Sequence, residues 1–513
     1  MKNLLMQVTQ SPLEVICSFA IAIALITFLL MPVFKGKTSR AKALSDPLDA
    51  PLIQLGPGEM LAVRGLLNGG IAIFGRAGSG KSSSSGKQLG AAIVNHKASG
   101  GLILAAKPED VPMWKRIFEA AGRSADLFVF SPYEKLRCNF LDYEMRRGGH
   151  TRNIVQCMSI IGESADGSNT RGGERDRYWE KQEERMTFNM VEVVKRATGK
   201  VSAKDMQRFL VDAAFSREQV ASHEWRKGFH CECLEAGHNA KKTRSEANDF
   251  QLAADYWLGE FPSMADKTRS SILAGVMGLL HVFNTGVVSD LVSGETNITP
   301  DDMFDRKWVI VDMSPTEWGQ LGSFVCSGWK FLTQRRVLRR DTKPSDCINV
   351  IWADEAQQFV NSYDAHYIAQ CRSHLGCMVF LSQSLPGYYA ALGGESGKHQ
   401  TQALLANFST TIFHACCSET AEFATKKIGK RLETFFGGST NPPIDAFDEL
   451  FGNKRFTGSF SEHYENILQD NVFQNGLRTG GKSNGYACDA IIIKSGEPFS
   501  TGENWLFKTF YQG

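Results

Sequence analysis

The segment IAIFGRAGSGKS, residues 71–82, constrains the fold of this chain more than any other. Its first four residues are apolar, which is typical of a buried strand. The next eight match the pattern G-x-x-x-x-G-K-[ST], a phosphate-binding loop that joins such a strand to a helix. A chance match in a segment rich in glycine and serine is the alternative, but the apolar run before the loop disfavours it. The segment therefore predicts a strand, a phosphate loop and a helix that begins near Ser82.

The loop residues have separate predicted roles. Glycines let backbone N–H groups approach phosphate oxygens, Lys81 adds a positive charge, and the hydroxyl of Ser82 suits Mg²⁺. The four serines that follow the lysine form helix poorly, but a bound polyphosphate satisfies the unpaired N–H groups at a helix start. We therefore expect ATP and Mg²⁺ to bind here, at the residues Gly75, Arg76, Ala77, Gly78, Ser79, Gly80, Lys81, Ser82 and Ser83.

A second candidate element is the run INVIWADEAQQF, residues 348–359, in which an apolar strand ends at two acids. Asp354 is suited to hold the shell of Mg²⁺. Glu355 is suited to polarise the water that attacks the terminal phosphate, which favours hydrolysis over transfer to another acceptor. The alternative is a helix start where acids interact favourably with the helix dipole.

Two further site residues are predicted near the strand at residues 377–381. Gln383 follows that strand and is suited to orient water or to sense the terminal phosphate. Arg372 ends the preceding helical stretch and is suited to reach the nucleotide of a neighbouring subunit as an arginine finger. Both have a structural alternative, and for Arg372 it is the favourable interaction of an arginine with a helix C-terminus.

The order of the remaining elements predicts the fold class. Strand patterns recur at residues 102–105, 127–130, 308–312 and 410–414, separated by helical stretches or by a long middle segment. Such alternation indicates a mostly parallel, helix-covered sheet of the α/β class. The middle segment lacks strand patterns and shows helical spacing. We expect a membrane anchor and basic linker at residues 1–50, a nucleotide-binding domain formed by residues 51–162 and 263–513, and an inserted all-helical domain at residues 163–262.

An apolar stretch at residues 15–34 has no charge over twenty residues, enough to cross a bilayer as a helix. Basic residues follow it, which places the large C-terminal portion in the cytoplasm by the positive-inside rule. A secretory signal peptide is the alternative, but its basic residues come first. The net charge of +2 gives no overall basic signature of a nucleic-acid binder.

With these elements in this order, the chain resembles the coupling-protein ATPases of type IV secretion and conjugation, in the FtsK-HerA group of motors. The segments GGIAIFGRAGSGKS, NVIWADEAQQF and GCMVFLSQSL carry the resemblance. It implies a RecA-like P-loop NTPase with an N-terminal transmembrane helix in the bacterial inner membrane. It also implies a homo-hexameric ring that handles DNA, with a relaxase or other secretion substrate and the secretion channel as partners.

Two features depart from that family. Many members have two transmembrane helices, whereas only residues 15–34 form a convincing span here. Members also commonly have an acid before a lysine after the next strand, where this chain has Ala105, Ala106 and Lys107. We expect the second departure to alter nucleotide or DNA contacts at this position.

The leading hypothesis is a membrane-tethered hexameric ATPase that couples hydrolysis to delivery of single-stranded DNA, or of a relaxase-DNA complex, to a secretion pore. A double-stranded DNA translocase is the alternative among motors. A nucleotide-gated membrane scaffold without hydrolysis is a third hypothesis, which Glu355 disfavours. A small-molecule kinase is a fourth, and it accounts poorly for the apolar span and for Arg372.

Overall fold

The structure is a computed structural model that describes residues 46–165, 174–393, 395–441 and 455–512. The chain divides into two compact units, residues 1–46 and 47–513, and the predicted membrane span at residues 15–34 lies outside the described residues. Within the described ranges no single helix is long and apolar enough to cross a bilayer. The helices Asp266–Asn284 and Gly286–Val292, bent by 75°, meet the length and composition criteria only as a pair.

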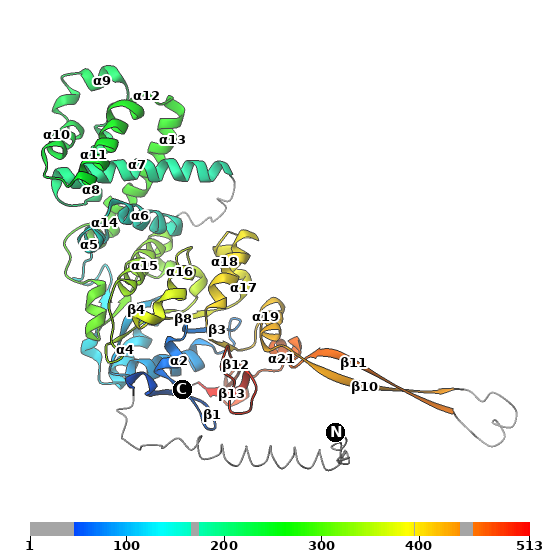
Figure 1. Ribbon diagram of the computed structural model, residues 1–513. Coiled ribbons are helices and arrows are strands. Elements are labelled where there is room, and N and C mark those ends of the chain that lie inside the picture. The colour runs from blue at the N-terminus through cyan, green and yellow to red at the C-terminus, as the bar shows by residue number, and fades with distance from the viewer. Residues whose placement is uncertain (1–45, 166–173, 394, 442–454, 513) are drawn as a thin grey trace, which may run out of the picture. The chain divides into compact units, whose positions relative to one another are not determined.

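Nine strands of the described residues form one sheet in the second unit (Figure 1). Seven of them are parallel, and the two at one edge, β13 and β12, are antiparallel to their neighbours. Across the sheet the order is β13 (Trp505–Tyr511), β12 (Ala487–Lys494), β9 (Thr410–Phe413), β3 (Ile71–Phe74), β8 (Gly376–Ser382), β7 (Ile348–Ala353), β4 (Ser99–Leu104), β6 (Trp308–Val311) and β5 (Leu127–Phe130).

The central strands are short and buried along their whole length. Side chains alternate between the two faces of a strand, so a strand buried on both faces is apolar throughout. The strands predicted at residues 71–74 and 127–130 have those bounds in the structure, and the other predicted strands differ at their ends by one to three residues. The α/β class with a mostly parallel sheet is therefore confirmed.

Helices cover both faces of the sheet. One face packs against α2 (Val63–Leu67), α3 (Lys87–Asn95) and α4 (Asp110–Ala120). The helices on the other face include α15 (Pro315–Leu338), α16 (Asp364–Gln370), α17 (Leu385–Ala391), α18 (Glu395–Ala406), α19 (Ser418–Ile428) and α21 (Asp470–Asn475). Each face has its own buried apolar cluster, which keeps the strands in place between two layers of helices.

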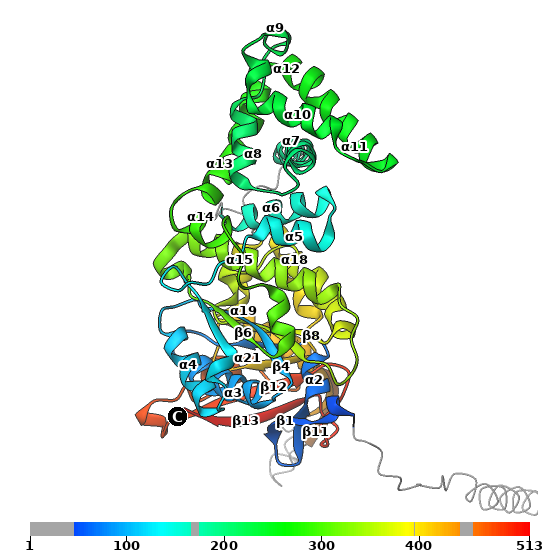
Figure 2. The ribbon, with the colours of Figure 1, turned by 90° about the vertical axis from the view of Figure 1, so that its left-hand side faces the viewer.

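Between β5 and β6 the described chain is helical and contributes no strand to the sheet. α6 packs on α15, so this helical part lies over the second face of the sheet (Figures 1 and 2). The boundaries 163–262 for an inserted domain remain a proposal, since helices continue on both sides of them. The helices are α5 (Phe140–Gly148), α6 (Thr151–Ala165), α7 (Glu174–Thr198), α8 (Ala203–Val211), α9 (Arg217–Ala221), α10 (Phe229–Asn239), α11 (Arg244–Asp255), α12 (Phe261–Ser263), α13 (Asp266–Asn284) and α14 (Gly286–Val292).

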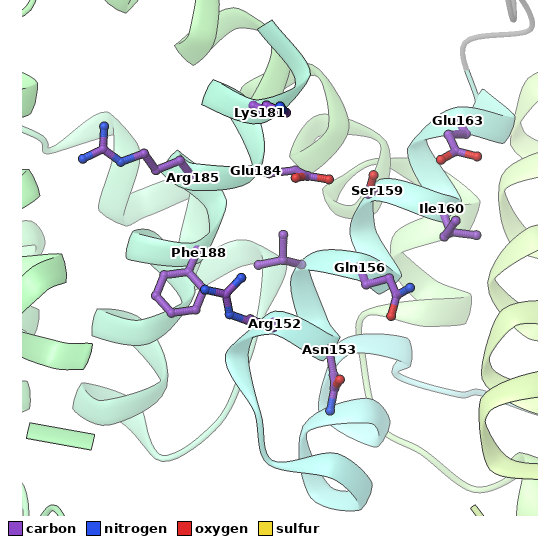
Figure 3. A pocket seen from close by; sticks show the side chains of 11 residues that line it. Arg152, Asn153, Gln156, Ser159, Ile160, Glu163, Lys181, Glu184, Arg185 and Phe188 are labelled. Carbon is purple, nitrogen blue, oxygen red and sulfur yellow. The ribbon is translucent and has the colours of Figure 1, made fainter. Parts of the chain in front are cut away.

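A pocket of about 630 Å³ lies between α6 and α7. Figure 3 shows charges of both signs around it, with the guanidinium of Arg152 5.5 Å from the ring centroid of Phe188. Arg185 on its rim is paired with Glu260 at 2.6 Å. The pocket has no glycine-rich loop and lies in the helical part, so it does not correspond to the predicted nucleotide site.

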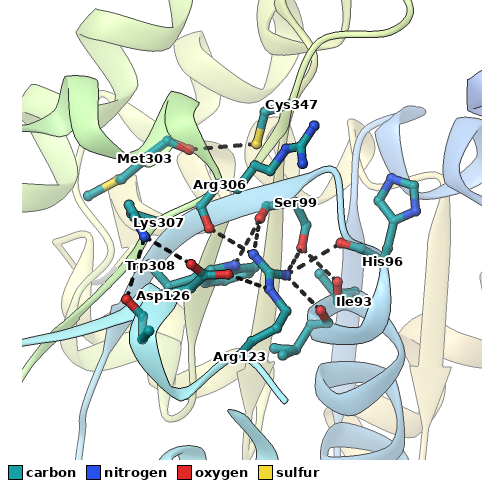
Figure 4. A network of polar contacts seen from close by, with 12 residues as sticks. Ile93, His96, Ser99, Arg123, Asp126, Met303, Arg306, Lys307, Trp308 and Cys347 are labelled. Carbon is teal, nitrogen blue, oxygen red and sulfur yellow. Dashed lines mark hydrogen bonds and ion pairs between the residues drawn. The ribbon is translucent and has the colours of Figure 1, made fainter. Parts of the chain in front are cut away.

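A buried arginine fastens several elements at the amino end of the parallel strands (Figure 4). Arg123 donates through Nη1 to Val94 O at 2.7 Å and through Nη2 to Arg306 O, also at 2.7 Å. Its Nε donates to Asp126 at 2.9 Å, and both amino groups contact Ser99 at the start of β4. The guanidinium therefore satisfies carbonyl groups from three segments at once, which is a structural role.

Two antiparallel pairs lie outside the main sheet. β1 (Pro51–Gly56) pairs with β2 (Glu59–Ala62), and β10 (Lys430–Asn441) pairs with β11 (Arg455–Asn466) in register over twelve residue pairs. The β10–β11 hairpin extends away from the main sheet (Figure 1). The sequence patterns predict neither of these two strand pairs, and they do not predict β12 or β13.

Candidate nucleotide site

The phosphate loop lies where the sequence predicts it, between β3 and a helix. That helix begins with one π-helical turn, η2 (Ser82–Gly86), and continues as α3. Gly78 and Gly80 have φ values of 75° and 86°, which favour glycine. A Cβ atom on Gly80 would lie 2.3 Å from Cys488 Sγ, so a side chain there would displace the start of β12.

The loop fits a polyanion such as the phosphates of a nucleotide. Within the described chain, the N–H groups of Gly78, Gly80 and Lys81 donate no hydrogen bond. The hydroxyl of Ser79 is buried and has no hydrogen-bond partner there either. Unsatisfied donors gathered at a helix N-terminus are suited to phosphate oxygens. The residues of the loop therefore have the donor chemistry that the motif predicts.

The two acids follow β7, at the same edge of the sheet as the phosphate loop. Glu355 has left-handed backbone angles, φ 48° and ψ 46°, and its N–H donates to Asp354 Oδ1 at 2.8 Å. Such angles are uncommon for a residue other than glycine and are found at functional sites. Both acids are buried, with 8% of Asp354 and 2% of Glu355 exposed.

Four donors converge on the carboxylate of Glu355. Lys81 Nζ lies 3.2 Å from Oε1, and Lys107 Nζ lies 3.3 Å from the same oxygen. Gln383 Nε2 donates to Oε1 at 3.1 Å, while Gln357 Nε2 donates to Oε2 at 2.9 Å. The donors come from four neighbouring strand ends, those of β3, β4, β8 and β7, so the order of the sheet assembles this cluster.

These contacts keep Glu355 ionised. Burial raises the pKa of its carboxyl group, but the hydrogen bond from Gln357 and the charge of Lys81 oppose burial. The hydrogen bond from Gln383 and the charge of Lys107 act in the same direction, and the net result is a pKa of about 2. Glu355 is therefore a carboxylate at neutral pH, able to accept a hydrogen bond from water or from a cation.

The other predicted site residues divide into two groups. Gln383 follows β8, as predicted, and its side chain also contacts Glu355, a contact that the sequence does not predict. Arg372 instead lies in η8 (Cys371–His374), just before the amino end of β8, whereas the phosphate loop is at the carboxyl ends of the strands. Its side chain is exposed and makes no hydrogen bond or ion pair with the described residues. Arg372 therefore does not belong to the nucleotide site of its own subunit.

Sequence reasoning named Lys107 only within a departure from the family pattern, and it did not predict Asp110. Lys107 follows β4 and is half-exposed, and Asp110 begins α4. The carboxylate of Asp110 accepts hydrogen bonds from Ala106 N at 2.9 Å and Lys107 N at 3.0 Å. Burial and the charge of Asp354 raise the pKa of Asp110 to about 6, although the two N–H groups oppose this. Asp110 thus places a carboxylate beside the backbone of Ala106 and Lys107, four residues after Ala106 in the chain.

The C-terminal strands also contact the phosphate-loop helix. Gln512 Nε2 donates to Ser83 Oγ at 2.7 Å. His414, which follows β9, lies 2.7 Å through Nε2 from Ser85 Oγ, and its Nδ1 donates to Asp489 O at 3.0 Å. Because that carbonyl only accepts, the proton of the ring is on Nδ1 and Ser85 donates to Nε2. Burial lowers the pKa of His414 to about 4, so the ring is neutral at physiological pH.

Other charged clusters in the described chain are used internally. Arg335 and Arg339 near the end of α15 pair with Glu144, and Arg336 pairs with Asp301. No group of three or more His, Cys, Asp or Glu side chains in the described ranges is placed to hold a metal ion. Ser82 and Asp354 therefore stay predicted ligands of Mg²⁺.

Comparison with solved structures shows the fold. The bacterial conjugative coupling protein TrwBdeltaN70, in its unbound monoclinic form, is 11% identical, with a TM-score of 0.55 over 90% of each chain. TrwB in complex with a non-hydrolysable ATP analogue is 13% identical, with a TM-score of 0.54 over 90% of this chain and 89% of that one. TrwB in complex with ADP and Mg²⁺ is 12% identical, with the same TM-score and coverage. No curated protein sequence matches the chain.

The sequence itself matches a family model described as type IV secretory system conjugative DNA transfer over residues 53–315, just over half of the chain. That region includes the phosphate loop and the strands from β3 to β6 with the helices between them. The chain belongs to the type IV secretory system conjugative DNA transfer family.

Proposed function

We propose that this chain is a membrane-tethered ATPase that couples ATP hydrolysis to the delivery of DNA, or of a relaxase-DNA complex, to a type IV secretion channel. The proposal rests on one observation: Lys81 and Gln383 contact Glu355 beside a phosphate loop whose backbone N–H groups lack hydrogen-bond partners. A carboxylate held in this position suits hydrolysis, which a scaffold that only binds nucleotide does not need.

ATP binds to the loop residues 75–83, with the free N–H groups and Lys81 directed to its phosphates. Ser82 and Asp354 hold Mg²⁺, which neutralises charge on the phosphates when bound. TrwB, which has this fold, has been solved with ADP and Mg²⁺ and with a non-hydrolysable ATP analogue, and this supports the assignment. Lys81 changes partner on binding, from Glu355 to a phosphate oxygen.

Hydrolysis then depends on Glu355. After Lys81 leaves, Lys107, Gln383 and Gln357 still hold the carboxylate in place. Glu355 orients a water molecule and accepts its proton as the oxygen bonds to the terminal phosphorus and ADP leaves. Gln383, 3.1 Å from Glu355, is suited to contact the same water or the terminal phosphate.

The active form is a homo-hexameric ring. Arg372 has no partner among the described residues and lies far along the strands from its own phosphate loop, so it supports a role as an arginine finger for a neighbouring subunit. The nucleotide-binding domain consists of residues 51–162 and 263–513, and the helices inserted at residues 163–262 contribute to substrate recognition. DNA and the secretion channel as partners follow from the family match.

Residues 15–34 form a single transmembrane helix in the bacterial inner membrane, and residues 1–50 together serve as anchor and basic linker. The absence of charge in that stretch and the basic residues after it support this arrangement, with the large C-terminal portion in the cytoplasm. A double-stranded DNA translocase is the second candidate, since the charge of the chain does not discriminate between single strands and duplex.

The test is ATP hydrolysis by the full chain in detergent without DNA, with single-stranded DNA and with duplex. We expect stimulation by single strands and a loss of about 100-fold or more in Glu355→Gln, which retains ATP binding. Stronger stimulation by duplex would favour the translocase. ATP binding without turnover in the wild type would contradict the motor hypothesis and favour a nucleotide-gated scaffold. Phosphate transferred to an acceptor other than water would indicate a kinase.

A further inference from the structure

We infer that one face of the β10–β11 hairpin is a contact surface for a second copy of this chain, and that it binds the neighbour beside that neighbour's phosphate loop. The inference rests on the ring proposed above. Each strand has twelve residues, so the hairpin spans about 40 Å. This length is sufficient to reach across the surface of an adjacent subunit.

The register of the hairpin sorts its side chains onto two faces. Leu432 pairs with Tyr464 and Phe436 pairs with Phe460, and these four residues lie on the same face because the pairs are four residues apart. Their exposed fractions are 51%, 68%, 85% and 73%. We call these four residues the aromatic face. Phe435 lies on the opposite face, where its ring centroid is 6.1 Å from that of His463.

An exposed set of this kind needs an explanation. An isolated two-stranded hairpin is marginally stable in water, and large apolar side chains exposed together indicate an interaction site. Three aromatic side chains bury roughly 150–250 Å² each when covered. A standard protein interface needs about 800 Å² on each partner. The aromatic face therefore supplies a large share of such an interface, with room for further contacts.

Two other partners fit the hairpin less well. Both strands of a hairpin have an open edge with unpaired backbone groups, which is unfavourable in the hydrocarbon of a bilayer. Nucleic acid attracts basic surfaces, yet β10 and β11 together have three residues of Lys or Arg (Lys430, Arg431 and Arg455) against three glutamates, so they carry no excess of basic residues. A protein surface remains as the favoured partner.

The position of the hairpin identifies the second copy as that partner. Lys427, shortly before β10, contacts Phe408 O and Thr411 Oγ1 at the amino end of β9. The hairpin therefore leaves the sheet from the amino ends of the parallel strands. Arg372, just before β8, lies at the same edge and has no partner in the described chain. A neighbour that receives this arginine at its nucleotide site must bring the carboxyl ends of its strands towards this edge.

Two exposed aromatic side chains lie at the edge of the sheet where the parallel strands have their carboxyl ends. Tyr511 at the end of β13 and Tyr486 before β12 are 61% and 45% exposed. Gln512 N donates to Tyr486 O at 2.9 Å, so the backbones of residues 486 and 511 lie close together. The side chain of Gln512 also contacts Ser83 on the phosphate-loop helix. A head-to-tail contact between different surfaces of identical chains closes into a ring when the rotation allows.

The first test compares two neighbouring phenylalanines of β10 in the full chain, purified in detergent, with ATP and single-stranded DNA. We expect Phe436→Asp combined with Phe460→Asp to weaken assembly at least tenfold in sedimentation velocity. Phe435→Asp, on the opposite face, is the matched control and should assemble like the wild type. All three proteins should have the same thermal unfolding midpoint, because the replaced side chains are exposed. Normal assembly of the double variant would overturn the inference.

The second test identifies the occupant directly. A photo-cross-linking amino acid at position 436 should give a product of twice the chain mass, with the attachment near Tyr486 or Tyr511 of the other copy. Cross-links only to lipid, to nucleic acid or to an unrelated protein would overturn the inference. The cross-linking and ATP hydrolysis are measured together, so that the two proposals can fail separately. Glu355→Gln, which should bind ATP without hydrolysing it, should still cross-link between copies. Cross-linking between copies without turnover in the wild type contradicts only the proposed function, and turnover without cross-linking contradicts only the hairpin contact.

Discussion

Two buried lysine–carboxylate pairs in this chain differ in how tightly their partners are held. Lys81 Nζ lies 3.2 Å from Glu355 Oε1, and the same carboxylate also pairs with Lys107 and accepts hydrogen bonds from two glutamine side chains. Lys330 and Asp364, between α15 and α16, are 2.6 Å apart and fully buried. The first pair adjoins a phosphate loop with unsatisfied backbone donors, whereas the second lies between two packed helices. Burial of an ion pair alone therefore does not identify a functional site.

Further hydrogen bonds hold both members of the second pair. Besides Lys330, the carboxylate of Asp364 accepts from Gln334 Nε2 at 2.7 Å and from Asn361 N at 3.0 Å, while Lys330 Nζ also donates to Phe359 O. Burial lowers the pKa of Lys330, although the charge of Asp364 opposes this. These contacts fasten the segment after Glu355 to α15, which makes the pair a support for the site and not part of its chemistry.

The largest predicted effect concerns this support. Lys330→Met leaves the Asp364 carboxylate buried without its cation, which should cost about 3–5 kcal/mol of stability. The measurement is the free energy of unfolding in urea. The control Lys330→Met combined with Asp364→Asn removes both charges and should recover much of the loss. If Lys330→Met is as stable as the wild type, the Lys330–Asp364 pair does not support the fold, and the proposed difference between the two pairs is wrong.

The next effect concerns the first pair. Lys81→Met should reduce ATP hydrolysis by about 100- to 1000-fold, because a cation directed to the phosphates is lost. Its stability should fall by about 1 kcal/mol at most, since three donors still hold Glu355. Phosphate release and urea unfolding of the same preparation measure both quantities. Turnover within tenfold of the wild type, or instability like that of Lys330→Met, would remove the distinction between the pairs.

The sequence predicted the first pair and not the second for a physical reason. A phosphate loop is a continuous pattern, and Asp354 and Glu355 follow a continuous apolar strand, so local residues reveal both elements. Lys330 and Asp364 meet only through the packing of two helices, and no short pattern records that contact. Lys107 reaches Glu355 because β4 lies beside β7, an order that a single sequence does not specify.

The missed strands follow the same logic. β12 contains the apolar run AIII, residues 490–493, which resembles the buried strands elsewhere and was a usable signal. β10 has adjacent phenylalanines followed by two glycines, which breaks the alternation expected of a strand with one solvated face. Its pairing with β11 is formed across residues 442–454, too long an interval for turn chemistry to indicate a hairpin. The α/β class survived these omissions because the parallel strands carry the clearest pattern.

The smallest predicted effect concerns Asp110, near the Lys81–Glu355 pair, and the dependence of stability on pH that its raised pKa causes. The pKa of Asp110 is raised to about 6, so the folded protein retains a proton that the unfolded chain loses near pH 4. The wild type therefore loses stability as the pH rises from about 4 through about 6, whereas an asparagine at this position does not titrate. Asp110→Asn should gain about 1 kcal/mol relative to the wild type between pH 5 and pH 7.5, measured by urea unfolding.

The control is Asp341→Asn, which removes an exposed carboxylate that follows α15, measured over the same pH range. Adding ADP and Mg²⁺ sharpens the test. A cation beside Asp354 offsets the negative charge that raises the pKa of Asp110, so the pH-dependent gain of Asp110→Asn should shrink when the ligands are present. A gain that is independent of pH would show that Asp110 does not titrate in this range. A gain that ligands leave unchanged would place the bound cation away from Asp354.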